Sequence, residues 1–132
     1  MQEVLDFLKE AQTFFIATVD DTRPKVRPFG FWMEYENRIY FSTSNQKNVC
    51  KQLAANPYFE ICCLCTGNQW MRLQGKAVFD ANLEAKIRAF EVMPSLAHIY
   101  KTPDNPFFEV FYVAEGQVTF YTFHDEPKTV AL

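Results

Sequence analysis

The residues best suited to chemistry lie in one segment, positions 25–56, which reads KVRPFGFWMEYENRIYFSTSNQKNVCKQLAAN. Arg27 lies on the first of its two extended runs, and Lys47 falls in the first turn of the helix predicted to follow. Between them, the second run ends in three hydroxyl-bearing residues, Ser42, Thr43 and Ser44. Backbone N–H groups at a helix N-terminus lack intrahelical partners, and the helix dipole favours negative charge there. Two cations beside such a helix start predict a binding site for phosphate.

The neighbours of Arg27 suit a planar ligand as well as an anion. Arg27 is predicted to share a strand face with Phe29 and Phe31, while Pro28 and Gly30 lie on the other face. Glycine has no side chain, so the backbone at Gly30 allows close approach of a flat ring. The alternative is an arginine in solvent, a serine-rich helix cap and a lysine on an exposed helix face, all of which are common.

No side chain presents itself as a hydrolytic catalyst. The chain has no G-x-S-x-G elbow, no P-loop and no G-x-G-x-x-G turn. His98 lies in a predicted helix and His124 lies just past the last predicted strand, and neither belongs to a nucleophile or metal-ligand motif. Catalytic residues therefore stay unassigned, and chemistry without a protein nucleophile or base is usually carried by a cofactor.

Four cysteines raise the question of a metal or redox site: Cys50, Cys62, Cys63 and Cys65. Cys62 and Cys65 have C-x-x-C spacing, but on a strand these two side chains point to opposite faces. We interpret the cysteines as small buried hydrophobes and predict no metal site. Free thiols and an acidic, amphipathic N-terminus unlike a signal peptide favour a cytoplasmic location.

The composition is typical of one globular domain covering residues 1–132, with 48% hydrophobic and 22% charged residues. Aromatic residues reach 17%, and they both favour strands and supply flat faces for planar ligands. No apolar run approaches the roughly 20 residues that span a bilayer, so we expect no membrane partner. The net charge of −3, without a basic stripe, argues against nucleic acid as a partner.

Hydrophobic periodicity predicts a mainly β protein. Helices are expected over 2–12, 46–55 and 83–93, with a further short helix through Tyr100, and Ser44 or Asn45 is the expected N-cap of the second. Strands are expected at about 13–19, 25–35, 38–43, 58–65, 70–79, 107–114 and 117–123, with Gly116 marking a turn or bulge. Short turns join most strands and βαβ alternation is absent, so an antiparallel barrel with peripheral helices fits best.

The sequence resembles the pyridoxamine 5′-phosphate oxidase-like family, the FMN-binding split barrels. The resemblance covers nearly the whole chain and rests on the order of several motifs: TFFIATVD, R-P-x-G-F-W, I-Y-F-S-T-S, a K-x-x-x-x-L helix, an N-P break and W-M-R-L-Q-G-K-A. The short length and the RPFGFW strand are similar to the small branch that includes nitroimidazole reductase-like proteins. The resemblance implies an antiparallel split β-barrel of Greek-key type with peripheral α-helices. It also implies a homodimer with FMN at the subunit interface.

Carried over residue by residue, the resemblance implies a set of FMN contacts. Arg27 matches the strand arginine that contacts the flavin, and Lys47 matches the helix-start lysine on the phosphate, with Asn48 beside it. Backbone beside the ring would come from Pro28, Phe29 and Gly30. The strand-end segment near the ring and ribityl chain would be Ser42, Thr43 and Ser44. Gln69 and Trp70 fall where the family often places a glutamine contributed by the partner subunit.

The implied function is that of an FMN-dependent oxidoreductase, which transfers electrons or hydride between reduced flavin and an unidentified small molecule. Trp32 stands where pyridoxamine oxidases carry a lysine, and their C-terminal Trp/Arg substrate segment has no counterpart, so their substrate does not follow. The strand face that carries Trp70, Arg72 and Gln74 would complete the pocket across a dimer. The alternative is a non-catalytic module for flavin binding, storage or sensing, or the same fold with haem or a deazaflavin.

Overall fold

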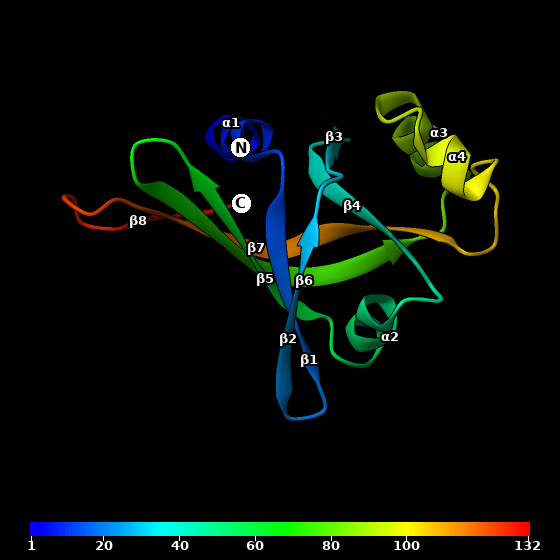
Figure 1. The fold of residues 1–132 in the computed structure, drawn as a ribbon, viewed down its shortest axis with the longest axis horizontal. Coiled ribbons are helices and arrows are strands. Elements are labelled where there is room, and N and C mark those ends of the chain that lie inside the picture. Colours follow the sequence, from blue (N-terminus) through cyan, green and yellow to red (C-terminus); the bar gives the residue numbers. More distant parts are fainter.

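Short turns and alternating burial organise most of the chain into one antiparallel sheet (Figure 1), seen in a computed structural model that describes residues 1–132. The strands are β1 (Phe14–Asp20), β2 (Arg23–Phe29), β3 (Met33–Tyr35), β4 (Arg38–Ser44), β5 (Tyr58–Cys65), β6 (Gln69–Asp80), β7 (Phe108–Tyr121) and β8 (Lys128–Ala131). The helices are α1 (Gln2–Ala11), α2 (Asn48–Ala55), α3 (Leu83–Val92) and α4 (Leu96–Tyr100). The hydrogen-bonded order is β2-β1-β5-β6-β7-β4-β3, and β8 pairs with β7. The predicted mainly antiparallel fold is confirmed.

The sheet curves without closing, because its two end strands, β2 and β3, are joined by the chain and not by hydrogen bonds. β2 pairs with β1, β3 pairs with β4, and residues 30–32 link them without regular structure. The prediction of one strand over 25–35 is therefore wrong. The extended run is interrupted at Gly30 because its two halves pair with strands at opposite ends of the sheet. This open seam agrees with the predicted split barrel.

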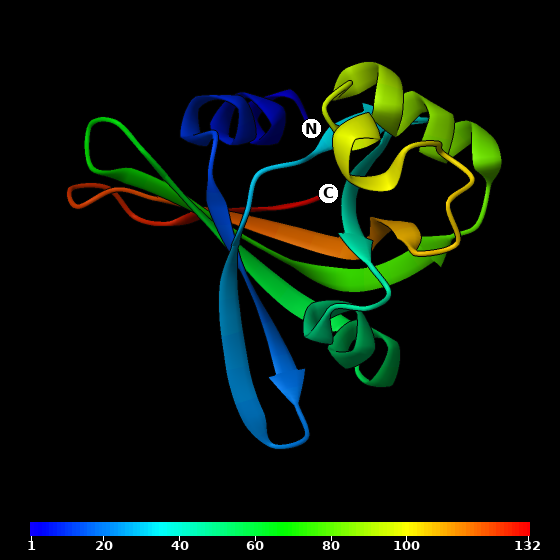
Figure 2. The same cartoon turned by 45° about the vertical axis from the view of Figure 1, so that its right-hand side comes forward.

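Two hydrophobic clusters pack against the sheet. The larger one includes residues of α1, α2 and the central strands, with Phe41 and Phe111 fully inaccessible to solvent. The smaller one includes residues of α3, α4 and β3, together with the buried Tyr40. α3 and α4 lie together on one side of β4 and α2 lies on the other (Figure 1), and the turned view again shows α2 apart from the α3–α4 pair (Figure 2). β4 serves both clusters because successive side chains on a strand point to opposite faces.

β7 is one bent strand, and the prediction of two strands at 107–114 and 117–123 is wrong in that respect. The predicted irregularity at Gly116 is confirmed as a bulge, since the pairing with β6 shifts register there and Glu115 has a φ of 53°. Opposite the bulge, Gly75 packs closely, because a Cβ at this position would lie 2.6 Å from Val113 Cγ1. The bulge allows β7 to pair with β6 along nearly its whole length and still follow the curvature of the sheet.

The C-terminal strand β8 was not predicted from the sequence. Its four residues pair with β7 after an irregular segment, and a run this short carries almost no period-two signal. None of the four helices is long and apolar enough to cross a membrane.

Candidate functional site

The start of α2 differs from the prediction in a way that favours ligand binding. The helix begins at Asn48, and Lys47 occupies the N-cap position with extended backbone and no side-chain cap hydrogen bond. The predicted caps are wrong because their side chains bind elsewhere. Ser44 Oγ accepts from the Gln46 N–H at 3.2 Å, and the Asn45 amide donates to Pro106 O at 2.7 Å. The first N–H groups of α2 are therefore left without a side-chain acceptor.

A cavity of about 400 Å³ brings Arg27 of β2 and Lys47 together, as the sequence pattern predicted. The residues that line it are Asp20, Lys25, Val26, Arg27, Lys47, Asn48, Val49 and Gln52. Three cations and one carboxylate make this lining positive in a chain whose net charge is −3. The three ion pairs of the protein, Arg72–Glu60, Arg88–Glu91 and Lys128–Glu3, involve none of these cations. The positive charge of Lys25, Arg27 and Lys47 is therefore free to attract an anion.

The Arg27 guanidinium is held by three acceptors of the protein itself. Its Nη1 donates to Thr18 Oγ1 at 2.7 Å and to the backbone oxygen of Ile16 at 3.3 Å. Its Nη2 donates to Gln52 Oε1 at 2.7 Å. Partial burial lowers the pKa of Arg27, but an arginine stays protonated at every physiological pH. The cation is thus fixed in direction and half-buried at the wall of the cavity.

Thr18 and Gln52 are functional candidates that sequence reasoning missed. Both are buried, at 2% and 9% exposure, on the apolar faces of β1 and α2. A polar residue at a position where the period predicts an apolar one is the signal that could have found them. The partner of each polar group, however, comes from a distant segment, and no sequence pattern pairs them.

The three strand-end hydroxyls, which the resemblance groups together, lie on two faces of β4. Ser42 and Ser44 point to the side of Tyr40, and Ser44 lines a second cavity of about 310 Å³ with Lys47, Tyr100 and Phe107. Thr43 faces the other side, and its Oγ1 is the one buried side-chain polar atom in the protein without a hydrogen-bond partner. This hydroxyl is an unsatisfied buried donor, and Thr43 lines neither of the two cavities. Lys47 is the residue that both cavities share.

The backbone at Gly30 is open. A Cβ placed there would meet no atom within 4 Å, and Gly30 lines a third cavity of about 430 Å³ with Trp32, Met33 and residues of α3. Pro28 is exposed, and Phe29 is half-buried with its ring edge-on to Phe14. The segment can therefore receive a flat ligand along its backbone, as the glycine suggested.

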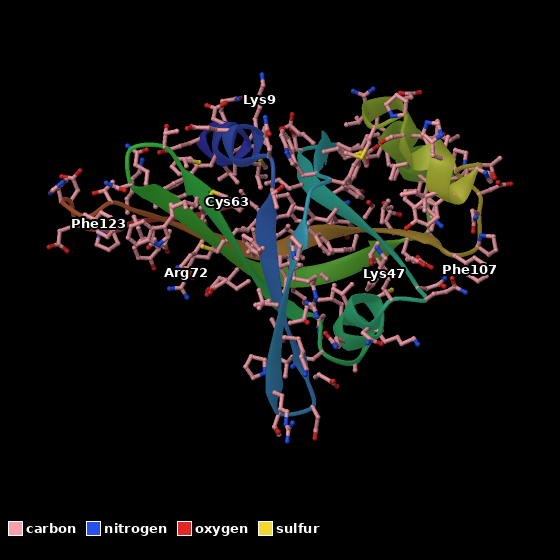
Figure 3. The ribbon with its side chains drawn as sticks, in the orientation of Figure 1. Lys9, Lys47, Cys63, Arg72, Phe107 and Phe123 are labelled. Carbon is pink, nitrogen blue, oxygen red and sulfur yellow. The ribbon has the colours of Figure 1, made fainter.

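Gln69 and Trp70 do not lie beside the Arg27 cavity within one chain. They begin β6, where the Trp70 ring stacks on Tyr121 at 5.2 Å and 4° and contacts Phe123 at 5.4 Å. Figure 3 shows Phe123 at one end of the molecule and Lys47 towards the other. Their predicted contribution from a partner subunit stays a prediction.

The comparisons with known proteins identify the family. The family profile described as "Pyridoxamine 5'-phosphate oxidase" matches residues 1–122. A NimC/NimA family protein from Clostridium acetobutylicum has a similar crystal structure, with 39% identity and a TM-score of 0.94 over 100% of this chain and 92% of that chain. The chain belongs to the pyridoxamine 5′-phosphate oxidase family. The family predicted from the sequence, with its small nitroimidazole reductase-like branch, is confirmed.

Two more distant structures share the fold of this pyridoxamine 5′-phosphate oxidase family member. A pyridoxamine 5′-phosphate oxidase-related, FMN binding protein from Nostoc punctiforme has 15% identity and a TM-score of 0.65, over 99% of this chain and 95% of that chain. A heme binding protein from Mycobacterium smegmatis has 14% identity and a TM-score of 0.70, over 95% of this chain and 55% of that chain. At these identities the likeness shows the fold alone. No curated protein matches the chain at a significant level.

Proposed function

We propose that this protein binds FMN, with the FMN phosphate at the start of α2. One observation carries the proposal: Arg27 and Lys47 line a single cavity at a helix N-terminus that has no side-chain cap, and neither cation has an ion-pair partner. A phosphate fits this donor set because it accepts several charge-assisted hydrogen bonds at once. Asn48, at the first helical position, lines the same cavity and adds a donor. The open backbone at Gly30 leaves room for the flavin ring.

We further propose that the protein is an oxidoreductase for a small molecule. Bound FMN would supply hydride or electron transfer at its ring, and the protein would bind and orient it. Arg27 and Lys47 neutralise the phosphate, while Gly30 and Trp32 line the third cavity, along the seam of the barrel. No side chain of the chain presents itself as a nucleophile or base, which agrees with chemistry carried by the cofactor. Pyridoxamine phosphate does not follow as the substrate, since Trp32 replaces the lysine of those oxidases.

We propose that the site is completed in a homodimer. The outer face of the sheet exposes large apolar side chains on three neighbouring strands: Phe15 is 50% exposed, Val26 is 67% exposed and Leu64 is 71% exposed. Trp70 and Arg72 lie on the same face of the sheet. Isolated apolar residues are normal on a surface, whereas a group on one sheet face favours a protein interface. A second copy would cover this face and bring its own Gln69 and Trp70 to the ligand.

The four cysteines form no disulfide, which supports a reducing compartment such as the cytoplasm. Neither His98 nor His124 lines any of the cavities described above, and both are exposed, so FMN is the better candidate than haem. We expect no nucleic acid or membrane partner, and no group of potential metal ligands lies close together.

The absorption spectrum of the purified protein, before and after reconstitution with FMN, is the test. Flavin bands are expected, whereas a haem Soret band or a deazaflavin spectrum would contradict the choice of cofactor. The holoprotein is then reduced chemically and mixed with a nitroaromatic or a quinone. Rapid reoxidation, faster than that of free reduced FMN, is expected of an oxidoreductase. Reoxidation no faster than that of free flavin would favour the binding, storage or sensor module instead.

A further inference from the structure

Gln52 is an unusual residue for the buried face of a short helix. Its neighbours on that face, Val49 and Leu53, belong to the hydrophobic core, and Gln52, although polar, is itself only 9% exposed. Burying an amide costs free energy unless its polar atoms find partners. Gln52 Oε1 does so twice, since it accepts from Thr18 Oγ1 at 2.6 Å and from Arg27 Nη2 at 2.7 Å.

Donor and acceptor roles in this cluster have a single solution. A guanidinium only donates, so the amide atom facing Arg27 must be the oxygen of Gln52. Thr18 Oγ1 accepts from Arg27 Nη1 and is left to donate its hydrogen to the same oxygen. The three side chains thus form a closed ring of hydrogen bonds, which comes from β1, β2 and α2.

The amide nitrogen of Gln52 takes no part in this ring. It forms no hydrogen bond in the protein, and it is not among the buried atoms without a partner, so it is accessible to solvent. Gln52 lines the cavity that also holds Arg27 and Lys47. Its N–H groups are therefore free donors in the space assigned to the phosphate.

We propose that Gln52 has two roles in anion recognition: its Oε1 positions the Arg27 guanidinium, and its Nε2 donates to the phosphate. Thr18 is a positioning residue in the same ring. This inference rests on the proposed FMN site. A preordered arginine loses less side-chain entropy when the anion binds, and a converging amide adds a donor that riboflavin, which has no phosphate, cannot use.

The test compares FMN with riboflavin, which shares the ring and ribityl chain but lacks the phosphate. For each variant, titration gives the ratio of the riboflavin Kd to the FMN Kd. Gln52→Met keeps the length of the side chain and removes both hydrogen-bonding atoms. We expect its ratio to be lower than that of the parent protein by about tenfold or more. Gln52→Glu keeps the acceptor for Arg27 but adds a negative charge in the cavity, so we expect an even lower ratio.

Thr18 supplies a matched pair. Thr18→Val cannot close the ring and is expected to lower the ratio, whereas Thr18→Ser retains the hydroxyl and is expected to preserve it. Gln2→Met, on the exposed start of α1, is the control for replacing a glutamine by methionine. A merely structural role for Gln52 would lower the melting temperature of Gln52→Met and leave the ratio unchanged, and this result would overturn the inference. If the parent protein bound neither flavin, the proposed function itself would fail.

Discussion

Gly75 on β6 allows the close packing of β6 against β7, and replacing it tests the account of the fold. In Gly75→Ala, the new Cβ would lie 2.6 Å from Val113 Cγ1, 3.2 Å from the Ala114 backbone oxygen and 3.6 Å from Phe59 Cζ. The valine is β-branched and stiff at χ1, and the carbonyl belongs to the paired strand, so neither moves away at low cost. Overpacking of this kind costs about 1–3 kcal/mol.

For a chain of 132 residues, this loss corresponds to a fall in melting temperature of about 4–11 °C. Gly30→Ala is the matched control, because a Cβ at position 30 would meet no atom within 4 Å. The stability of this variant should equal that of the parent protein or slightly exceed it. The assay is thermal unfolding followed by circular dichroism on the flavin-free proteins. Combining Gly75→Ala with Val113→Ala should cost less than the two single changes together, since the clashing methyl is gone. An unchanged melting temperature in Gly75→Ala would refute the packing argument.

Three further predictions concern the site and its surroundings. Lys47→Ala should weaken FMN binding by about 10- to 150-fold, which is the loss in affinity expected when one charge-assisted hydrogen bond is removed. Lys51→Ala, one turn later on an exposed face of the same helix, is the control and should leave the affinity for FMN unchanged. Equal effects of the two changes in a fluorescence titration would contradict the phosphate assignment. Thr43→Val removes the hydroxyl that has no partner, so the free energy of unfolding in urea should rise by about 1 kcal/mol, and a decrease would show that the hydroxyl is satisfied. Burial and the hydrogen bond to Asp80 raise the pKa of Tyr40 to about 12. The stabilising contribution of Tyr40 is therefore present below about pH 10 and is lost as the pH rises towards 12. Between pH 9 and pH 11 the parent protein should lose more stability than Tyr40→Phe, and equal losses in the two proteins would argue against this linkage.

Much of the fold could be predicted because its elements carry strong local signals. Alternation along β6 and the Glu36–Asn37 turn between β3 and β4 are visible in the sequence, and both are present in the structure. The failures occur where tertiary pairing decides. The break at residues 30–32 arises because β2 and β3 lie at opposite ends of the sheet, which no local pattern reveals. β8 is strand only because β7 is there to pair with it.

The charged residues of the candidate site could be predicted from the sequence, whereas their hydrogen-bond partners could not. Arg27 and Lys47 could be brought together from the expected hairpin and helix, and they line one cavity. The ring of hydrogen bonds that orients Arg27 depends on Thr18 and Gln52, two buried polar residues 34 positions apart. The helix cap was mispredicted because Asn45 binds the Pro106 carbonyl, a contact between distant segments. Local rules identify residue types at a site, whereas the partners of those residues follow from the folded chain.

The central claim is that the start of α2 and the two cations beside it hold the phosphate of FMN. Calorimetric titration of the flavin-free protein with FMN, and separately with riboflavin, tests it most directly. We predict saturable binding of one FMN per chain and riboflavin binding weaker by tenfold or more, a preference of about 1.4 kcal/mol or greater for the phosphate. Equal affinity for the two flavins, or no binding of either, would contradict the account.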